Sequence, residues 1–323
     1  NHPTINKAIE KQIQDFGHIM FGGFTHKPAI ILSERLVALA PTPLSRVFYS
    51  DNGSTAIEVA LKMSLQYWQH CDQPKKSHFI SFENAYHGDT IGTMSVSGVD
   101  LFHSVFKPVL FKSYKVPVPS IHEHDSDASL SKKEAYCLDK FTTLLETKQD
   151  SIAAFICEPL LMGAGGMIHY RPQFLSKVRD LCTRYNIHMI ADEIATGFGR
   201  TGTFFACEQA SISPDFLCIS KALTNGMTPL AATLTHNDIY MAFYDDYNTN
   251  KTFYHGHTFT ANAIGCAIAN ATLDIFEHDQ TLTHVHNIAR YFHSKCDALR
   301  HLNTVHNLRI LGMTAAFELH NPN

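Results

Sequence analysis

The sequence IHMIADE at residues 187–193 and the sequence FLCISK at residues 216–221 decide the fold of this chain. Each is a short apolar run, typical of a buried strand, that ends near a charged residue: Asp192 in the first and Lys221 in the second. Lys221 follows Asp192 by 29 positions, which suits one strand-to-strand crossover in an α/β sheet. Because such sheets bind ligands outside the carboxyl ends of their strands, we expect both side chains at one edge.

An acid and an amine at one sheet edge allow two interpretations. The lysine can react with a carbonyl group, and the aspartate can keep a pyridinium nitrogen protonated. The alternative is a plain surface ion pair, since ionisable residues are common at strand ends.

Composition limits the function classes. The 323 residues, 45% of them hydrophobic and 17% charged, predict one large domain plus part of a second. The net charge of −4, without a basic cluster, argues against nucleic acid and against an anionic membrane surface, and favours a small-molecule ligand. No apolar run approaches the roughly 20 residues that span a bilayer, and the start lacks a signal-peptide pattern, so we expect a cytoplasmic protein.

Cysteine and histidine spacing gives no sign of a metal site. The eight cysteines are scattered without C-x-x-C pairs and predict reduced, mostly buried thiols. The 21 histidines include no H-E-x-x-H motif, and we expect no metal.

Alternating strand and helix patterns predict an α/β fold with a largely parallel sheet. Strand patterns lie at 47–49, 78–82, 153–157, 187–191 and 230–234, and helical patterns at 28–40, 56–69, 172–185 and 258–275. Residues 116–133, rich in Pro, Ser and Asp, predict a loop. We expect an N-terminal segment over 1–45, a large domain over 46–280 and the start of a smaller, truncated domain over 281–323. The chain opens inside a helical pattern without Met, which indicates an interior part of a longer protein.

The turn before the second helical pattern predicts an anion site. Gly53 and Ser54 stand between a strand pattern and a long helix, where free N–H groups and the helix dipole attract a phosphate. An ordinary Ser/Thr helix cap is the alternative.

The segment Gly197-Phe198-Gly199-Arg200-Thr201-Gly202 matches the G-x-G-x-x-G pattern of dinucleotide sites. No clear helix follows it, and no acid ends a second strand about 20 residues on, so NAD binding is not expected. The same loop could carry Arg200 into the pocket, where a guanidinium would position a carboxylate.

Several of these stretches together resemble the class III aminotransferases, which use pyridoxal 5′-phosphate (PLP), and most closely the branch that acts in biotin synthesis. The matching stretches are FGGFTH at 21–26, ALKM at 60–63 with QYW at 66–68, YHGDT at 86–90, ADEIATGFGRTG at 191–202 and SKALT at 220–224. The resemblance implies PLP-dependent transferase fold type I, with a mostly parallel central sheet, helices on both faces and a smaller α+β domain.

The resemblance also implies residue roles. Lys221 would bind PLP covalently and move the substrate proton, and Asp192 would pair with the pyridinium nitrogen. Gly53 and Ser54 would hold the phosphate. Tyr86 would stack on the cofactor ring and line the substrate pocket.

Further implied roles concern substrates and assembly. Gly256, His257 and Thr258 match a family segment that reaches across a homodimer interface, with Thr258 completing the partner's phosphate site; position 257 is often proline in the biotin branch. Asp89 and Arg200 are candidates for contacts with substrate. The branch transfers an amino group from S-adenosylmethionine to 8-amino-7-oxononanoate, which gives 7,8-diaminononanoate.

Three alternatives stay open on the sequence. Another class III aminotransferase, acting on ornithine, acetylornithine or an ω-amino acid, would share the Lys221 chemistry. A non-catalytic fragment could bind PLP without turnover. An oxidoreductase that uses a dinucleotide comes last.

Overall fold

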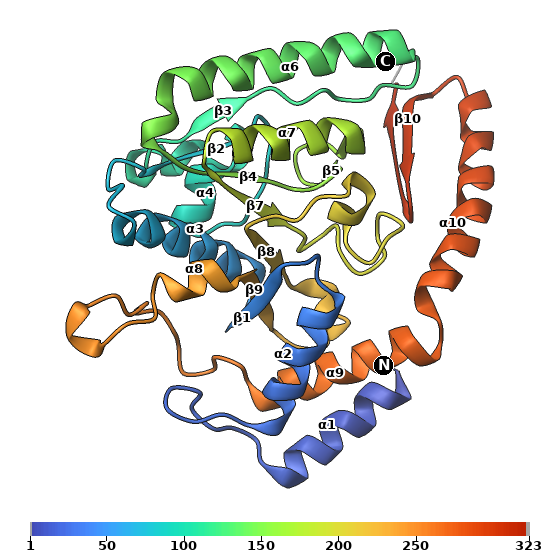
Figure 1. Cartoon of the computed structure of the whole chain (residues 1–323). Coiled ribbons are helices and arrows are strands. Elements are labelled where there is room, and N and C mark those ends of the chain that lie inside the picture. The colour runs from blue at the N-terminus through green and yellow to red at the C-terminus, as the bar shows by residue number, and fades with distance from the viewer. Residues whose placement is uncertain (1, 321–323) are drawn as a thin grey trace.

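The computed structural model of the protein describes residues 2–320 and contains a seven-stranded sheet with helices on both faces (Figure 1). The strand order is β1-β9-β8-β7-β4-β2-β3. The strands are β1 (Leu44–Ser50), β2 (His78–Phe82), β3 (Tyr114–Val116), β4 (Ile152–Cys157), β7 (His188–Asp192), β8 (Phe216–Ile219) and β9 (Ala231–His236). Only β9 runs against its neighbours, so the prediction of a largely parallel sheet is confirmed.

Ten α-helices surround this sheet in the described residues. They are α1 (Pro3–Asp15), α2 (Lys27–Leu39), α3 (Gly53–His70), α4 (Ile91–Val96), α5 (Asp100–His103), α6 (Asp127–Lys148), α7 (Pro172–Arg184), α8 (Asn237–Met241), α9 (Ala263–His278) and α10 (Thr281–Asp297). The short hairpins β5 (Leu161–Met162) with β6 (Ile168–His169) and β10 (Val305–Leu311) with β11 (Thr314–Leu319) lie outside the main sheet.

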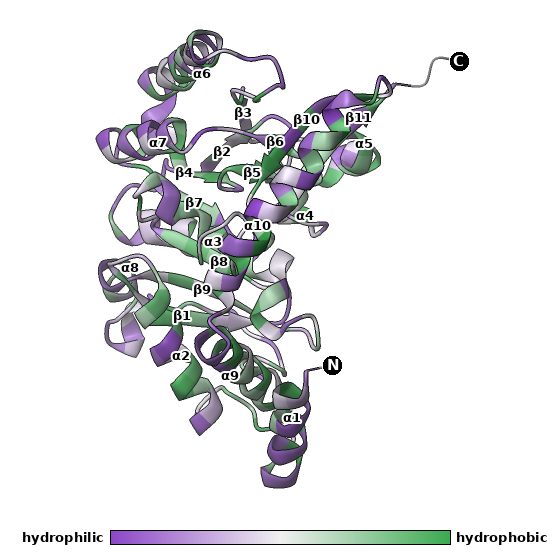
Figure 2. Ribbon diagram, turned by 90° about the vertical axis from the view of Figure 1, so that its right-hand side faces the viewer, coloured by the Kyte–Doolittle hydropathy of each residue, from purple (hydrophilic) through white to green (hydrophobic). Residues whose placement is uncertain are grey.

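Alternation along the strands divides the core into two layers. Phe155 of β4 and Met189 of β7 pack with residues of α2, α6, α7 and α9. Ile156 and Ile190, one position later, pack against α3 on the opposite face. Successive strand side chains point to opposite faces, so each crossover helix finds an apolar surface. Figure 2 shows hydrophobic strands at the centre and hydrophilic residues on much of the outer helices.

The N-terminal helix belongs to the same body. Ile5 of α1 is fully buried against Ile268 and Ala271 of α9, and α1 lies along α9 in both views (Figures 1 and 2). The chain continues from α9 into α10 and then into the β10–β11 hairpin, which lie along one flank of the molecule (Figure 1). The division of the chain at 45 and at 280 stays a prediction.

Two element boundaries differ from the sequence-based expectation. The predicted loop over 116–133 ends early, because Ser126 caps α6 by accepting the Ser129 N–H at 3.2 Å and the helix begins at Asp127. The helix expected from 258 begins at Ala263, where Asn262 accepts the Gly265 N–H at 3.0 Å. In both places the N-cap hydrogen bond, rather than the composition of the stretch, sets where the helix begins.

Candidate active site at the carboxyl edge of the sheet

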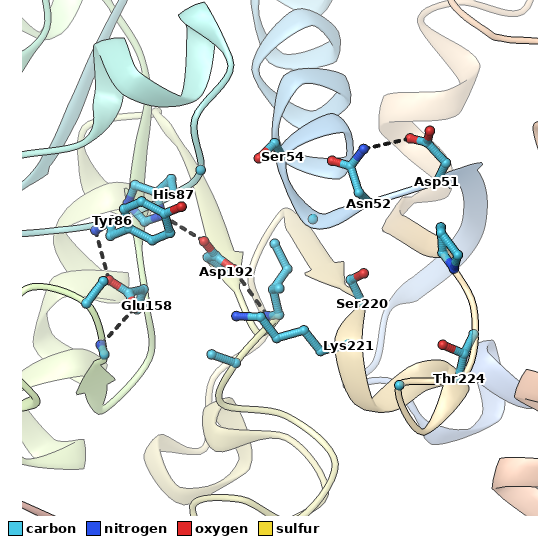
Figure 3. Close-up of a pocket in the computed structure, with 18 of the residues that line it drawn as sticks. Asp51, Asn52, Ser54, Tyr86, His87, Glu158, Asp192, Ser220, Lys221 and Thr224 are labelled. Atoms are coloured by element: carbon cyan, nitrogen blue, oxygen red, sulfur yellow. Dashed lines mark hydrogen bonds and ion pairs between the residues drawn. The ribbon is translucent and has the colours of Figure 1, made fainter. Parts of the chain in front are cut away.

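A cavity of about 630 Å³ opens at the carboxyl ends of the parallel strands. Its lining residues follow five strands of the main sheet, which is where open α/β sheets place their ligands. They are Asp51 to Ser54 after β1, Tyr86 to Gly88 after β2, Glu158, Gly163 and Ala164 after β4, Asp192, Ile194 and Ala195 at the end of β7, and Ser220, Lys221, Thr224 and Gly226 to Pro229 after β8. The structure therefore brings Asp192 and Lys221 to one cavity, as the sequence predicted (Figure 3).

Asp192 is buried and held from two sides. Its Oδ2 lies 2.8 Å from Nδ1 of His87, and its Oδ1 accepts the Ile194 N–H at 3.2 Å. The His87 ring is buried as well, and its backbone N–H donates to the Ser97 hydroxyl at 2.9 Å. An imidazole beside a carboxylate favours a proton on the facing nitrogen, so His87 donates to Asp192. The carboxyl group is thus fixed in place by two hydrogen bonds.

Lys221 has the opposite environment. The residue is exposed to the cavity, and no hydrogen-bond partner for its amine occurs in the described residues. Its backbone has φ of +44°, in the left-handed region that residues with a Cβ seldom adopt. The hydroxyl of Ser220 donates to the Leu230 carbonyl at 2.8 Å and anchors the turn. Backbone strain of this kind is typical of functional sites.

The start of α3 presents backbone N–H groups without acceptors at the cavity. Asn52 caps the helix by accepting the Thr55 N–H at 3.0 Å, which corrects the alternative of a Ser54 or Thr55 cap. The N–H groups of Gly53 and Ser54 have no acceptor within the described residues. A Cβ on Gly53 would come within 2.9 Å of the Ile194 side chain, which would have to shift to accommodate it. A phosphate fits this turn.

Gly88 shows how closely the neighbouring loop approaches the same turn. Its φ is +127°, and an added Cβ would lie 2.1 Å from the Ser54 hydroxyl oxygen. Any side chain at position 88 would displace Ser54, which lines the cavity.

Tyr86 lies on the other side of the cavity. Its hydroxyl donates to Asp89 Oδ2 at 2.8 Å, and its ring stacks at 6.2 Å on the ring of His103. Partial burial and the Asp89 hydrogen bond raise the pKa of Tyr86 to about 12, so the phenol is neutral near pH 7. Asp89 itself is exposed and does not line the cavity; it reaches the site through Tyr86.

Arg200 does not reach the cavity in this chain. Its side chain is exposed and is absent from the cavity wall. Gly199 and Gly202, with φ of +87° and +112°, turn the loop outward, and the Arg200 carbonyl accepts the Met313 N–H at 2.9 Å. Arg200 is thus not part of this cavity wall, and its contact with substrate stays a prediction.

Gly256, His257 and Thr258 also lie outside their own chain's cavity wall. Gly256 and Thr258 are exposed, and His257 Nε2 is 3.9 Å from Asp51 Oδ1. Their predicted contacts with cofactor and substrate would form in the partner's active site, so these contacts stay predictions.

Two charged or titratable residues of the cavity wall, His87 and Glu158, were not predicted from the sequence. His87 stands in the YHGDT stretch, but its contact with Asp192 spans 105 positions and has no local signal. Glu158 follows the apolar run 153–157 directly, the same signal that marked Asp192, and could have been found in that way.

Comparison with known proteins identifies the family. The family model for aminotransferase class III matches residues 1–323. The chain is a class III aminotransferase. It is 46% identical over 319 residues to adenosylmethionine-8-amino-7-oxononanoate aminotransferase of Geobacter sulfurreducens, covering 98% of this chain and 70% of that protein. It is 41% identical to the Aquifex aeolicus protein of the same name, with 99% and 70% covered.

Solved structures of aminotransferases agree with this assignment. The crystal structure of adenosylmethionine-8-amino-7-oxononanoate aminotransferase from Methanocaldococcus jannaschii matches with a TM-score of 0.91 at 37% identity, covering 99% of this chain and 71% of that one. A PLP-bound amine transaminase from an uncultivated Pseudomonas species matches with a TM-score of 0.90 at 30% identity, with 99% and 73% covered.

These comparisons confirm the predicted family, the transaminase fold and PLP as the cofactor of this aminotransferase. The residues present also fit PLP, because the cavity offers a phosphate-sized turn, a buried carboxylate and a free amine. Across residues 2–320, no group of three His, Cys, Asp or Glu has the arrangement of a metal site. Within the same range, every helix is too short or too polar to cross a membrane.

Proposed function

We propose that this class III aminotransferase transfers an amino group from S-adenosylmethionine to 8-amino-7-oxononanoate and forms 7,8-diaminononanoate in biotin biosynthesis. The observation that carries the proposal is the meeting of Asp192, Lys221 and the α3 N-terminus in one cavity. The names of the relatives that align over nearly the whole chain supply the substrates. The amine transaminases among the structural neighbours make another amine donor the second candidate.

The cavity residues divide the work of holding PLP. The N–H groups of Gly53 and Ser54 would receive the phosphate, and Asp192 would face the pyridine nitrogen. Tyr86 would cover the ring from its side of the cavity. When bound there, PLP supplies the electron sink for loss of a proton from the substrate carbon.

Lys221 is the proposed proton carrier. A lysine that moves a proton must reach the substrate carbon, and Lys221 lines the cavity with no hydrogen-bond partner for its amine in the described residues. The strained backbone aims the side chain from the end of β8. Ser220 keeps that turn in place through the Leu230 carbonyl.

Asp192 and His87 are proposed to act as a fixed charge. Two donors hold the carboxylate, so it keeps its position while charge develops in the neighbouring ring. The burial of both side chains excludes water and strengthens their electrostatic effect.

The proposal includes a homodimer with shared active sites. Gly256 and Thr258 are exposed and His257 is half-buried between them, which agrees with a segment that contributes to a partner's site. A cytoplasmic location is part of the proposal; it agrees with the eight cysteines, all of which are free thiols.

A donor screen tests the function. The protein is incubated with PLP, 8-amino-7-oxononanoate and one donor at a time, and 7,8-diaminononanoate is measured by mass spectrometry. We expect product with S-adenosylmethionine. Product only with alanine, lysine or another simple amine would support the second candidate, an aminotransferase that uses a different amine donor.

A further inference from the structure

Glu158 is a buried carboxylate in the cavity that the mechanism above does not use. It is 4% exposed and stands directly after β4. Its Oε1 accepts the Tyr86 N–H at 3.0 Å, and its Oε2 accepts the Gly163 N–H at 3.0 Å. A carboxylate has about four acceptor positions, so roughly two remain for a ligand. Because Glu158 lines the cavity, a donor on a bound ligand can take them.

The position of Glu158 separates it from the proposed phosphate site. Figure 3 shows Glu158 beside Tyr86 on one side of Asp192, while Asn52 and Ser54 of the anion turn lie on the other. A ligand group at Glu158 is therefore on the side where the substrate, rather than the phosphate, extends.

The charge of the cavity wall favours a cation on that side. Glu158 and Asp192 line this side of the cavity, and Asp51 lies beside Asn52 on the other side. Lys221 is the one lysine or arginine among the described lining residues. Lys221 and Asp192 are assigned to the cofactor. Glu158 is left as an acidic partner without a basic one, and a buried carboxylate is stabilised by a cation that arrives with the ligand.

The surroundings of Glu158 keep its charge adjustable. Burial and the neighbouring Asp192 carboxylate raise its pKa to about 8, against the opposing effects of the Tyr86 and Gly163 N–H groups and of Lys221. The groups that face it are Asp192 from β7, Lys221 after β8, and Tyr86 and His87 from the loop after β2. A bound ammonium group would lower this raised pKa and favour the charged form of Glu158.

We propose that Glu158 binds the ammonium group that the acceptor carries on the carbon next to its ketone, and so makes the cavity selective for an amino ketone over a plain ketone of the same length. The inference rests on the proposed function, because it takes 8-amino-7-oxononanoate as the acceptor. It adds a specificity-determining residue to that function. When the protonated carboxyl binds the ammonium group, its O–H bond breaks and the proton passes to solvent, and every C–C, C–N and C=O bond of the ligand stays intact.

A pair of ligands that differ only in the amine tests the inference. Dissociation constants of 8-amino-7-oxononanoate and 7-oxononanoate are measured by calorimetry on borohydride-reduced holoenzyme, in which Lys221 no longer reacts. We expect the unaltered protein to prefer the amino ketone by roughly 10- to 100-fold, the range of a charge-assisted hydrogen bond. Glu158→Gln should lose most of that preference.

Glu193→Gln is the matched control. Glu193 is also a buried carboxylate that accepts two backbone N–H groups, from Ala206 at 3.0 Å and Cys207 at 2.8 Å, but it does not line the cavity. This variant should keep the preference for the amino ketone. The control separates the loss of a backbone acceptor from the loss of a ligand partner.

The pH dependence gives a second test that needs no variant. Between pH 6 and 7.5, ionisation of Glu158 becomes easier as pH rises, so the preference for the amino ketone should increase with pH. A ratio that stays flat over this range contradicts the assignment.

The outcomes distinguish the two levels of the account. The inference is overturned if Glu158→Gln keeps the preference for the amino ketone, or if it loses affinity equally for both ligands. Glu158 would then have only a structural role, in which it accepts the N–H groups of Tyr86 and Gly163. Either of these results leaves the proposed function standing, as long as the unaltered enzyme aminates 8-amino-7-oxononanoate. An enzyme that binds and aminates neither ketone refutes the proposed function, and the inference falls with it.

Discussion

Strands β7 and β8 lie side by side and each leads to a charged residue in the cavity, yet the two residues are held in opposite ways. Asp192 is buried and has two hydrogen-bond partners, His87 and Ile194. Lys221 is exposed, its amine has no partner within the described residues, and its backbone φ is +44°. Hydrogen bonds constrain the side chain of Asp192. At Lys221 the constraint lies in the backbone conformation instead.

The carboxyl edge of one sheet thus serves two tasks. A group that must keep one charge in one place benefits from fixed donors around it. A group that must react and carry a proton needs a mobile side chain on a well-placed backbone. The following predictions test whether the contrast between Asp192 and Lys221 has this meaning.

Replacing Lys221 should have the largest effect. Lys221→Ala removes both the covalent attachment and the proton carrier, so amino transfer should fall by about 10⁴-fold or more. The assay is formation of 7,8-diaminononanoate by mass spectrometry. Circular dichroism should show an intact fold, because the side chain is exposed. Activity within tenfold of the unaltered enzyme would remove Lys221 from its proposed role.

Replacing the charge of Asp192 should come next. Asp192→Asn keeps the shape and the contact with the Ile194 N–H but removes the negative charge, so turnover should fall by about 10²- to 10³-fold. Binding of PLP, measured by equilibrium dialysis, should persist. Full turnover in this variant would show that the fixed charge is dispensable.

Removing the support of Asp192 should cost less. His87→Leu deletes the donor at 2.8 Å and leaves the Asp192 side chain itself unaltered, and we expect about a 10-fold loss in kcat with little change in KM. His188→Leu is the control, since His188 is also buried but bonds to Ser64 at 2.9 Å, away from the cavity. An equal loss in kcat for both variants would mean that burial of any histidine explains the effect.

A second lysine sharpens the contrast with the smallest expected change. Burial lowers the pKa of Lys115 from 10.5 to about 7, and its amine donates to the Ser81 hydroxyl at 2.8 Å outside the cavity. Between these two pH values the unfolded chain binds more protons, so this group makes stability rise with pH from about 7 to 10.5. Lys115→Met should reduce that rise in urea unfolding and leave amino transfer unchanged. A loss of transfer would show that a low amine pKa, rather than position, defines the reactive lysine.

The sequence was sufficient where the signal is local. Apolar runs ending near Asp192 and Lys221 predicted the sheet edge, and the Gly53–Ser54 turn before a helix predicted the anion site. The contact between His87 and Asp192 was not predictable in this way, because it depends on how β2 and β7 are placed in the sheet, with β4 between them.

Turn geometry explains why Arg200 does not line the cavity. The glycines around Arg200 indicated a tight loop, but not the direction in which it turns. Positive φ angles at Gly199 and Gly202 send the loop toward the β10–β11 hairpin, where the Arg200 carbonyl meets Met313. A glycine pattern predicts conformational freedom and leaves the choice of direction to tertiary contacts.

The central claim is that the free amine at the end of β8 is the group that binds PLP. The most direct test is a visible absorption spectrum of the protein with PLP, before and after borohydride reduction, followed by peptide mapping of the labelled lysine. The account predicts a visible band that disappears on reduction and a label on Lys221. Label on another lysine such as Lys115, or no reducible band in protein that has bound PLP, would contradict it.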